Sequence, residues 1–340
     1  TRNDVIAPDS LKLLFEYHQS DTDKYTDYLS AYIIKRLEVK IGSNTVYDVD
    51  NYDRYKIQKD YWLPKYKKGC MLMEGVQSED LYKFRQGIRS ADQTEVTQSE
   101  LAFSAAPVGA EFNKYNINLD FDLFQDFFCP QSLEDDVIIN IHLKSGGYEL
   151  KNISLCYEKI NDEQLANDLY ERMNNYTLDY EHVKFFKNIS GVAGVDKNVE
   201  INSKFNSLKA IFMVDKKNLN SENFSKQILD PKTSLYVNID GVSNRLFPNG
   251  MIQNEGWVEA FKYFTGGDYL VELDINQKTY YTRKHFLVVN FYGIEIKKNI
   301  QLRYKAYSLL NDGVANDTLL FTVANAKVNF VDGRFSQLVV

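Results

Sequence analysis

Proline, cysteine and tryptophan are scarce in this chain, and long apolar runs are absent from it. Only 6 Pro, 3 Cys and 2 Trp occur among its 340 residues. No stretch reaches the ~18 consecutive apolar residues of a membrane-spanning helix, and no basic-then-apolar signal peptide is recognisable. Cys70, Cys129 and Cys156 include no CxxC pair, which predicts neither a disulfide framework nor a zinc site and favours a reducing compartment.

An excess of positive charge is also missing. The formal net charge is −7, which argues against a surface built to hold a phosphate backbone. Short basic runs at 65–68 and 297–298 are expected to be solvated surface. We therefore expect no strong binding of nucleic acid.

Aromatic residues and period-two alternation are what the chain has in abundance. With 24 Tyr and 21 Phe, it favours pleated, half-buried surfaces. The clearest strand is expected at 115–123, where apolar and polar residues alternate, and Ser145-Gly146-Gly147 predicts a hairpin turn after 137–143. Further strands are expected at 37–41, 153–157, 199–205, 207–214, 235–239, 269–275, 286–292, 300–304, 319–323 and 326–331. The sequence thus predicts an all-β protein made of antiparallel sandwiches.

Two segments have helical periodicity instead. One follows Ser20, with an apolar stripe from Tyr25 to Ile33, and the other follows Asp162, a candidate N-cap, with Leu165, Ala166, Leu169 and Met173 on one face. Shorter helical or irregular insertions are expected near 61–73, 123–128 and 257–264.

The length of the chain fits two domains, and the second helix lies where a connector between them would be. We predict two tandem jelly rolls at 1–160 and 183–340, joined by a connector helix and linker at 161–182. A weak internal echo supports duplication, because the phrase beginning at Leu37 (LEVKIGSN) resembles the one beginning at Leu235 (LYVNIDGVSN).

No segment of the sequence matches a catalytic, cofactor-binding or metal-binding motif. The 191–197 segment lacks the phosphate-loop spacing, and Asp48, Asp50 and Asp53 lack the glycine and glutamate of a calcium loop. His18, His142, His182 and His285 share no metal-binding spacing, and Asp135-Asp136 has no nucleophile pattern beside it. We expect no catalytic, cofactor-binding or metal-binding residue, although β-sandwich glycosidases, whose carboxylates are scattered through the sequence, keep an enzyme as an alternative.

The order of elements is itself distinctive. The strand and turn at 37–47 lead to an irregular region, then to strands at 115–121, 137–141 and 150–157, the connector helix, and strands opening at 183–186 and 207–214. Over residues 30–335 this order resembles the double jelly-roll major capsid proteins of tailless icosahedral DNA viruses, particularly those of virophages and Polinton-like elements, in the adenovirus hexon-like lineage.

The resemblance implies a homotrimer whose six jelly rolls form a pseudo-hexagonal capsomer, with no catalysis and no cofactor. Its partners would be neighbouring capsomers and penton or minor capsid proteins, and its place the virion, assembled in the host cell interior. Loops at 244–250 and 266–267 are candidates for a tower or an intersubunit seam, or plain surface loops. The rival interpretation is a two-domain β-sandwich binding module for carbohydrate or a receptor, which calls for a compact aromatic platform, whereas the aromatics here are spread along the chain.

Overall fold

The computed structural model describes residues 4–19, 33–70, 113–119, 122–146, 148–173, 177–190, 194–215, 232–243, 247–268, 270–273, 275, 277, 280, 286–305 and 317–340. These residues form two compact units. Unit 1 comprises 1–53, 65–182 and 326–339, and unit 2 comprises 54–64, 183–325 and Val340. Residues 54–64 thus belong to unit 2, which is formed mainly by the C-terminal half, and residues 326–339 belong to unit 1, which is formed mainly by the N-terminal half. The domain ranges 1–160, 161–182 and 183–340 stay a prediction.

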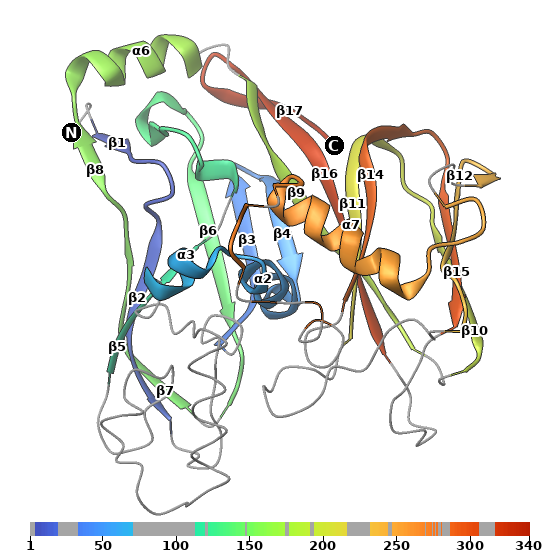
Figure 1. Ribbon diagram of the computed structural model, residues 1–340. Helices are drawn as coiled ribbons and strands as arrows, with labels where there is room; N and C mark the ends of the chain where they lie inside the picture. Colours follow the sequence, from blue (N-terminus) through green and yellow to red (C-terminus); the bar gives the residue numbers. More distant parts are fainter. Residues whose placement is uncertain are drawn as a thin grey trace, which may run out of the picture. The chain divides into compact units, whose positions relative to one another are not determined.

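Unit 1 consists mainly of antiparallel strands (Figure 1). Its elements are β1 (Asp4–Ile6), β2 (Lys12–Gln19), β3 (Ile34–Ile41), β4 (Asn44–Asp50), α3 (Lys65–Cys70), β5 (Asn113–Asn118), η2 (Asp122–Phe124), η3 (Pro130–Ser132), β6 (Val137–Leu143), β7 (Tyr148–Cys156), β8 (Lys159–Asn161), α6 (Glu163–Met173) and β17 (Arg334–Val339). One sheet has the order β5-β2-β7, β1 pairs with β8, and β4, β3 and β6 are neighbours in a further sheet.

Strand β2 shows why these segments fold as a sandwich. Leu13, Phe15 and Tyr17 alternate with half-buried residues and are at most 4% exposed, so one face of the strand lies in the core. Across the ladder, Leu13 is opposite Ile117, and Phe15 is opposite Tyr115. This strand was not predicted, because Leu14 interrupts the polar side of the alternation.

Unit 2 contains β10 (Asp196–Ile201), β11 (Phe205–Asp215), β12 (Tyr236–Ile239), β13 (Val242–Ser243), α7 (Gln253–Thr265), β14 (Phe286–Ile296) and β15 (Ile300–Lys305). Three elements run through both units: α2 (Tyr52–Tyr61), β9 (Thr177–Ile189) and β16 (Thr318–Val331). Within unit 2, one sheet has the order β10-β15-β12-β13, and β14, β11 and β16 are neighbours in the other.

Strand β11 is the centre of the unit 2 core. Its residues 210–214 are all buried, and because consecutive side chains point to opposite faces, both faces of the strand are covered. Helix α7 packs along β14 (Figure 1). From α2, the Tyr55 ring stacks on Phe212, with ring centroids 6.0 Å apart.

Several predicted elements are confirmed. Strand β6 occupies the expected 137–143, β15 covers the expected 300–304, and α6 follows Asp162, whose Oδ1 accepts a hydrogen bond from the Leu165 amide at 3.0 Å. Helix α7 includes the predicted insertion at 257–264. It ends at Gly266, which has the left-handed φ of 64° that a helix C-cap favours. The helix expected after Ser20 lies outside the described residues.

Other predictions are wrong in their boundaries or pairing. The strand expected at 115–123 ends at Asn118, and Leu123 belongs to the short 3-10 turn η2. The strand expected at 269–275 is replaced, in its described part, by turn and loop with one bridge at Leu273. The segments 319–323 and 326–331 form the single strand β16, because Ala324 and Ala326 continue its buried face.

The hairpin predicted around Ser145 is also wrong. Strand β6 pairs with β3, whereas β7 pairs with β2. Strands β6 and β7 therefore belong to different sheets of unit 1, although they follow one another in the chain. A short polar segment with glycines predicts a turn but does not specify which strands pair across it.

The two echoed phrases both form hairpins. Strands β3 and β4 are joined at Gly42-Ser43, and β12 and β13 at Asp240-Gly241. Asp240 and Gly241 have φ of 51° and 85°, the pair of positive angles that a type I′ turn requires. The equivalence of the two hairpins between the jelly rolls stays a prediction.

Candidate interaction surfaces

The carboxylates of Asp48, Asp50 and Asp53 are all engaged in structural contacts. Asp48 holds Arg36 through two hydrogen bonds, at 2.6 Å from Nε and 2.7 Å from Nη2. Asp50 accepts a hydrogen bond from the Asn51 amide, and Asp53 pairs with Lys144. Over the described ranges, no group of three His, Cys, Asp or Glu side chains is placed to hold a metal ion.

The acidic pair at 135–136 fastens a loop to a hairpin. Asp135 accepts a hydrogen bond from the Phe335 amide at 3.0 Å, and the Asp136 carbonyl accepts one from the Gly42 amide at 2.9 Å. Beside them, Glu134 binds the Arg334 guanidinium, with 2.6 Å between Oε2 and Nε. These contacts give Asp135-Asp136 a role in holding unit 1 together.

Histidines and cysteines are dispersed. His142 is exposed, as expected for the solvent face of β6, and His182 lies edge-on to Tyr180 with ring centroids 6.1 Å apart. Cys129 is buried and Cys156 half-buried, and both are free thiols. His285 lies outside the described residues. No helix of the described chain is both long and apolar enough to cross a bilayer.

Charged side chains of Arg36, Glu38 and Lys40 lie on one face of β3, where Glu38 is only 7% exposed. Strand β3 lies between β6 and β4. Glu38 accepts a hydrogen bond from Asn140 of β6 at 2.8 Å and lies 3.5 Å from Arg36. Arg36 in turn donates hydrogen bonds to Asp48 of β4. The hydrogen bond from Asn140 is the main cause that lowers the pKa of Glu38, and Lys40 adds to it. Because these charges are already paired, they tie three strands together rather than offering an unpaired charge to a ligand.

The first candidate surface is the open edge of unit 1, where aliphatic side chains remain partly exposed. Strands β6 and β7 are the terminal strands of two sheets and follow one another in the chain. We define this β6–β7 edge by four aliphatic residues, Ile139, Ile141, Ile153 and Leu155. Leu155 is opposite the buried Leu13 and Ile141 opposite the buried Leu37, so both point to the core face of their sheets.

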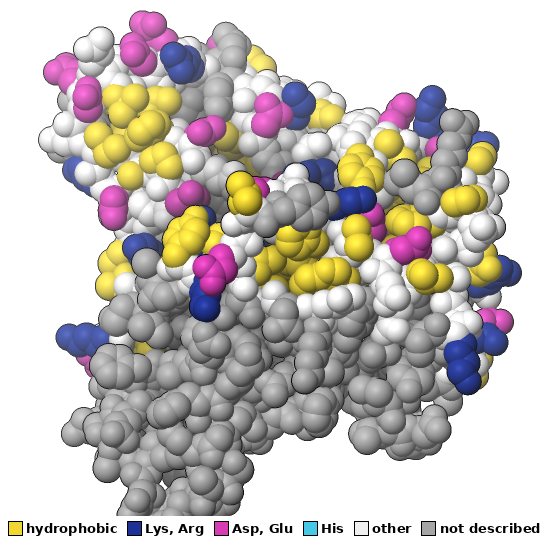
Figure 2. All heavy atoms as spheres, in the orientation of Figure 1, with side chains coloured by type: hydrophobic (Ala, Val, Ile, Leu, Met, Phe, Trp, Pro, Cys, Tyr) yellow, Lys and Arg dark blue, Asp and Glu magenta, His cyan; other side chains and the backbone are white. Residues whose placement is uncertain are grey.

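These aliphatic side chains are nevertheless incompletely covered. Ile153 is 50% exposed and Leu155 44% exposed, while Ile139 and Ile141 are half-buried. Unit 1 therefore carries core-type side chains that its own fold leaves partly in water, a pattern typical of association surfaces. On the face displayed in Figure 2, hydrophobic side chains reach the surface in several groups with both signs of charge between them.

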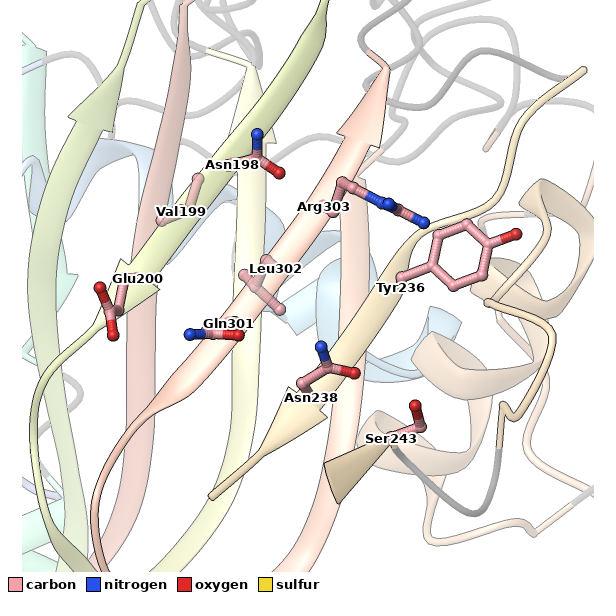
Figure 3. Close-up of a pocket in the computed structure, with 9 residues that line it drawn as sticks. All are labelled: Asn198, Val199, Glu200, Tyr236, Asn238, Ser243, Gln301, Leu302 and Arg303. Atoms are coloured by element: carbon pink, nitrogen blue, oxygen red, sulfur yellow. The ribbon is translucent and has the colours of Figure 1, made fainter. Parts of the chain in front are cut away.

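The second surface is a groove on the outward face of the four-stranded sheet of unit 2 (Figure 3). In one row, Asn198 of β10, Arg303 of β15 and Tyr236 of β12 are opposite one another. In the next row lie Glu200, Gln301, Asn238 and Ser243. The groove has a volume of about 600 Å³, within the range of small-molecule sites.

Some side chains of the groove are restrained by contacts with neighbouring side chains. The Arg303 guanidinium lies over the Tyr236 ring, 4.7 Å from its centroid, a cation–π contact that fixes both groups. Glu200 accepts a hydrogen bond from Asn299 at 2.5 Å. None of these residues was predicted as a site, because their only signal in the sequence is polar alternation along strands, which every solvent-facing strand shares.

The loops suggested for a tower or an intersubunit seam differ in how closely other atoms pack around their glycines. Gly250 has a φ of 83°, and a Cβ there would lie 2.5 Å from the Ser234 Cβ, so glycine is required for packing. Gly266 and Gly267 have open space around them. Residues 244–246 lie outside the described part, and an interface role for these loops stays a prediction.

The sequence and the fold of this chain give different results when they are compared with known proteins. No family model matches the sequence, and no curated protein matches it. Solved structures do: one from the PBCV-1 virus capsid has a TM-score of 0.56 at 10% identity, covering 99% of this chain and 89% of that one. The Sputnik virophage structure gives 0.57 at 10% identity, covering 100% and 84%. The mavirus major capsid protein gives 0.52 at 10% identity, covering 98% and 84%.

The chain has the double jelly-roll fold. The match extends over nearly the whole length of both chains, so the predicted all-β fold class and the resemblance to these capsid proteins are confirmed at the level of the fold. At about one identical residue in ten, the likeness lies in the fold.

Proposed function

We propose that this protein is a major capsid protein that assembles into homotrimeric, pseudo-hexagonal capsomers of an icosahedral viral shell. The observation that carries the proposal is the full-length double jelly-roll match to structures from the PBCV-1 capsid, Sputnik and mavirus. A chain with two jelly rolls supplies six similar walls when three copies close a ring, which suits hexagonal tiling. In this role the protein resides in the virion and has a structural function rather than a catalytic one.

The β6–β7 edge supports self-association. Its aliphatic side chains continue the core face of unit 1 but remain up to 50% exposed, and burying apolar area gains roughly 25 cal/mol per Å². We propose that another copy covers this edge. The contact is proposed to be heterologous, because such contacts close into rings when the rotation between copies is a fraction of a turn.

Neighbouring capsomers, and penton or minor capsid proteins, are the proposed further partners. The −7 net charge of the chain favours contacts with protein over direct packing on nucleic acid. Exposed loops of the C-terminal half, including 266–267, are candidates for the seam between capsomers.

Light scattering coupled to size-exclusion chromatography tests the proposal. Obligate interfaces typically bury 2,000–5,000 Å², so we expect three times the mass of 39.5 kDa at about micromolar concentration. Negative-stain images of the same fraction should show particles with a hexagonal outline. A stable monomer in mild salt would contradict the proposal and favour a two-domain binding module.

A further inference from the structure

The groove on the sheet β10-β15-β12-β13 has the chemistry of a ligand site rather than of a protein interface. Interface cores are depleted of charge and about 65% apolar, whereas the side chains that face outward here are amides, a hydroxyl, one Glu, one Arg and one Tyr. The buried Val199 and Leu302 point to the opposite side, into the core. We propose that this groove binds a neutral oligosaccharide.

Charge decides which class of ligand fits. Among the described residues that line the groove, Glu200 and Arg303 are the only ones with a formal charge, and their charges cancel. A sulfated or phosphorylated chain would meet Glu200 without a surplus of cations, so a polyanion is disfavoured. A neutral ligand that hydrogen-bonds widely is favoured instead.

The unpaired amides identify that ligand more closely. Asn198, Asn238 and Gln301 make no side-chain hydrogen bond to any other described residue, and Ser243 makes none either. Each amide offers both donors and an acceptor, and the hydroxyl does the same. Sugar hydroxyls are also donors and acceptors at once, so adjacent hydroxyls of one ring match an amide with two parallel hydrogen bonds.

The Arg303–Tyr236 pair supplies the apolar part of such a site. The Tyr236 residue is 39% exposed, and the guanidinium 4.7 Å from its ring centroid restrains it. A rigid aromatic ring next to polar groups suits the C–H faces of a sugar. Jelly rolls are used by lectins as well as by viral capsids, and the inference does not depend on the capsid role proposed above.

The test uses the full-length protein on an array of neutral, sialylated and sulfated oligosaccharides, followed by calorimetric titration of the neutral glycan that binds best. The double variant Gln301→Ala, Asn238→Ala removes two hydrogen-bonding amides. Because the hydrogen bonds of two amides are lost, we expect the affinity for the glycan to fall about tenfold or more. Ser243→Ala should lower it less, and Gln337→Ala, an exposed strand glutamine outside the groove, should leave it unchanged.

Four results would overturn the inference. These are the absence of binding to any neutral glycan, equal binding by the double variant, binding confined to anionic glycans that salt abolishes, and a change of oligomeric state in the double variant. The last would mark the groove as an interface between copies. Light scattering on the same samples reports assembly separately from glycan binding. A trimer that binds no glycan would contradict the glycan site but not the capsid proposal. A monomer that binds glycan would contradict the capsid proposal but not the glycan site.

Discussion

Trp62 and Trp257, the only tryptophans of the chain, pack against each other in unit 2 with ring centroids 5.1 Å apart. Trp62 follows α2 and Trp257 lies in α7, so both come from helical insertions rather than from strands. Trp62 also stacks on Phe264 at 5.4 Å and meets Phe286 of β14 at 6.4 Å. This aromatic cluster brings the 54–64 segment of the N-terminal half into the core of unit 2.

Trp62→Ala should therefore destabilise unit 2 strongly. The residue is 2% exposed, and removing a buried aromatic side chain costs about 3–5 kcal/mol. We expect a lower Tm in circular dichroism melts. The control Tyr66→Ala removes a side chain that is 71% exposed and should change stability by about 0.5 kcal/mol or less; equal losses in both variants would contradict the packing described here.

Gly333 is expected to be irreplaceable in the turn between β16 and β17. It has a φ of 72°, and a Cβ there would lie 2.7 Å from the Ser132 carbonyl oxygen, a backbone atom. Gly333→Ala thus adds a clash to the roughly 1–2 kcal/mol of left-handed strain. Gly267→Ala, at a φ of 82° in open space, carries only the strain, so its Tm should fall less. A reversed order would refute the close approach.

The Asp240 carboxylate should make stability depend on pH in acid. Its oxygens accept hydrogen bonds from the Lys297, Lys298 and Asn299 amides at 3.0, 2.7 and 3.2 Å. These hydrogen bonds, the one from Lys297 first, lower its pKa from the ordinary value of 3.8. Because the folded-state pKa is the lower one, the stabilisation is present above that ordinary value and is lost as the pH falls through the folded-state pKa.

The substitution Asp240→Asn removes the carboxylate charge and keeps the side chain at nearly the same size. We expect the wild type to melt at a higher temperature than Asp240→Asn at pH 7, and the difference to shrink as the pH approaches 2. Asp126→Asn, at an exposed position outside any strand, is the matched control for the Asp-to-Asn substitution itself. A difference that is independent of pH would assign the effect to something other than carboxylate ionisation.

A charge on the β6–β7 edge should block assembly. Leu155→Asp places a carboxylate on the core side of the edge strand, where the proposed contact would desolvate it at a cost of several kcal/mol. We expect light scattering to show monomers. Ser154→Asp introduces the same charge at the next position, which is exposed and points to the other face of β7, and should still assemble; intact trimers of Leu155→Asp would exclude this edge from the interface.

The sequence by itself determined the local structure of several strands and of the helices at 163–173 and 253–265. Alternation located β6 and β15, and the Asp162 cap with its stripe located α6. The class of the fold followed from the number and order of such segments. At only 10% sequence identity to the PBCV-1 capsid structure, the order of strands still predicted the double jelly-roll fold, because burial on a pleated sheet constrains polarity and spacing more than residue type.

Only the tertiary structure decided which segments meet. Residues 54–64 and 326–339 join the unit of the other half of the chain, and β6 pairs with β3 rather than with β7. Neither choice leaves a local signal, since strand pairing and core sharing depend on contacts between residues distant in sequence. The polar groove was hidden for the same reason: Gln301, Asn238 and Glu200 become neighbours only when antiparallel pairing sets them in register across three strands.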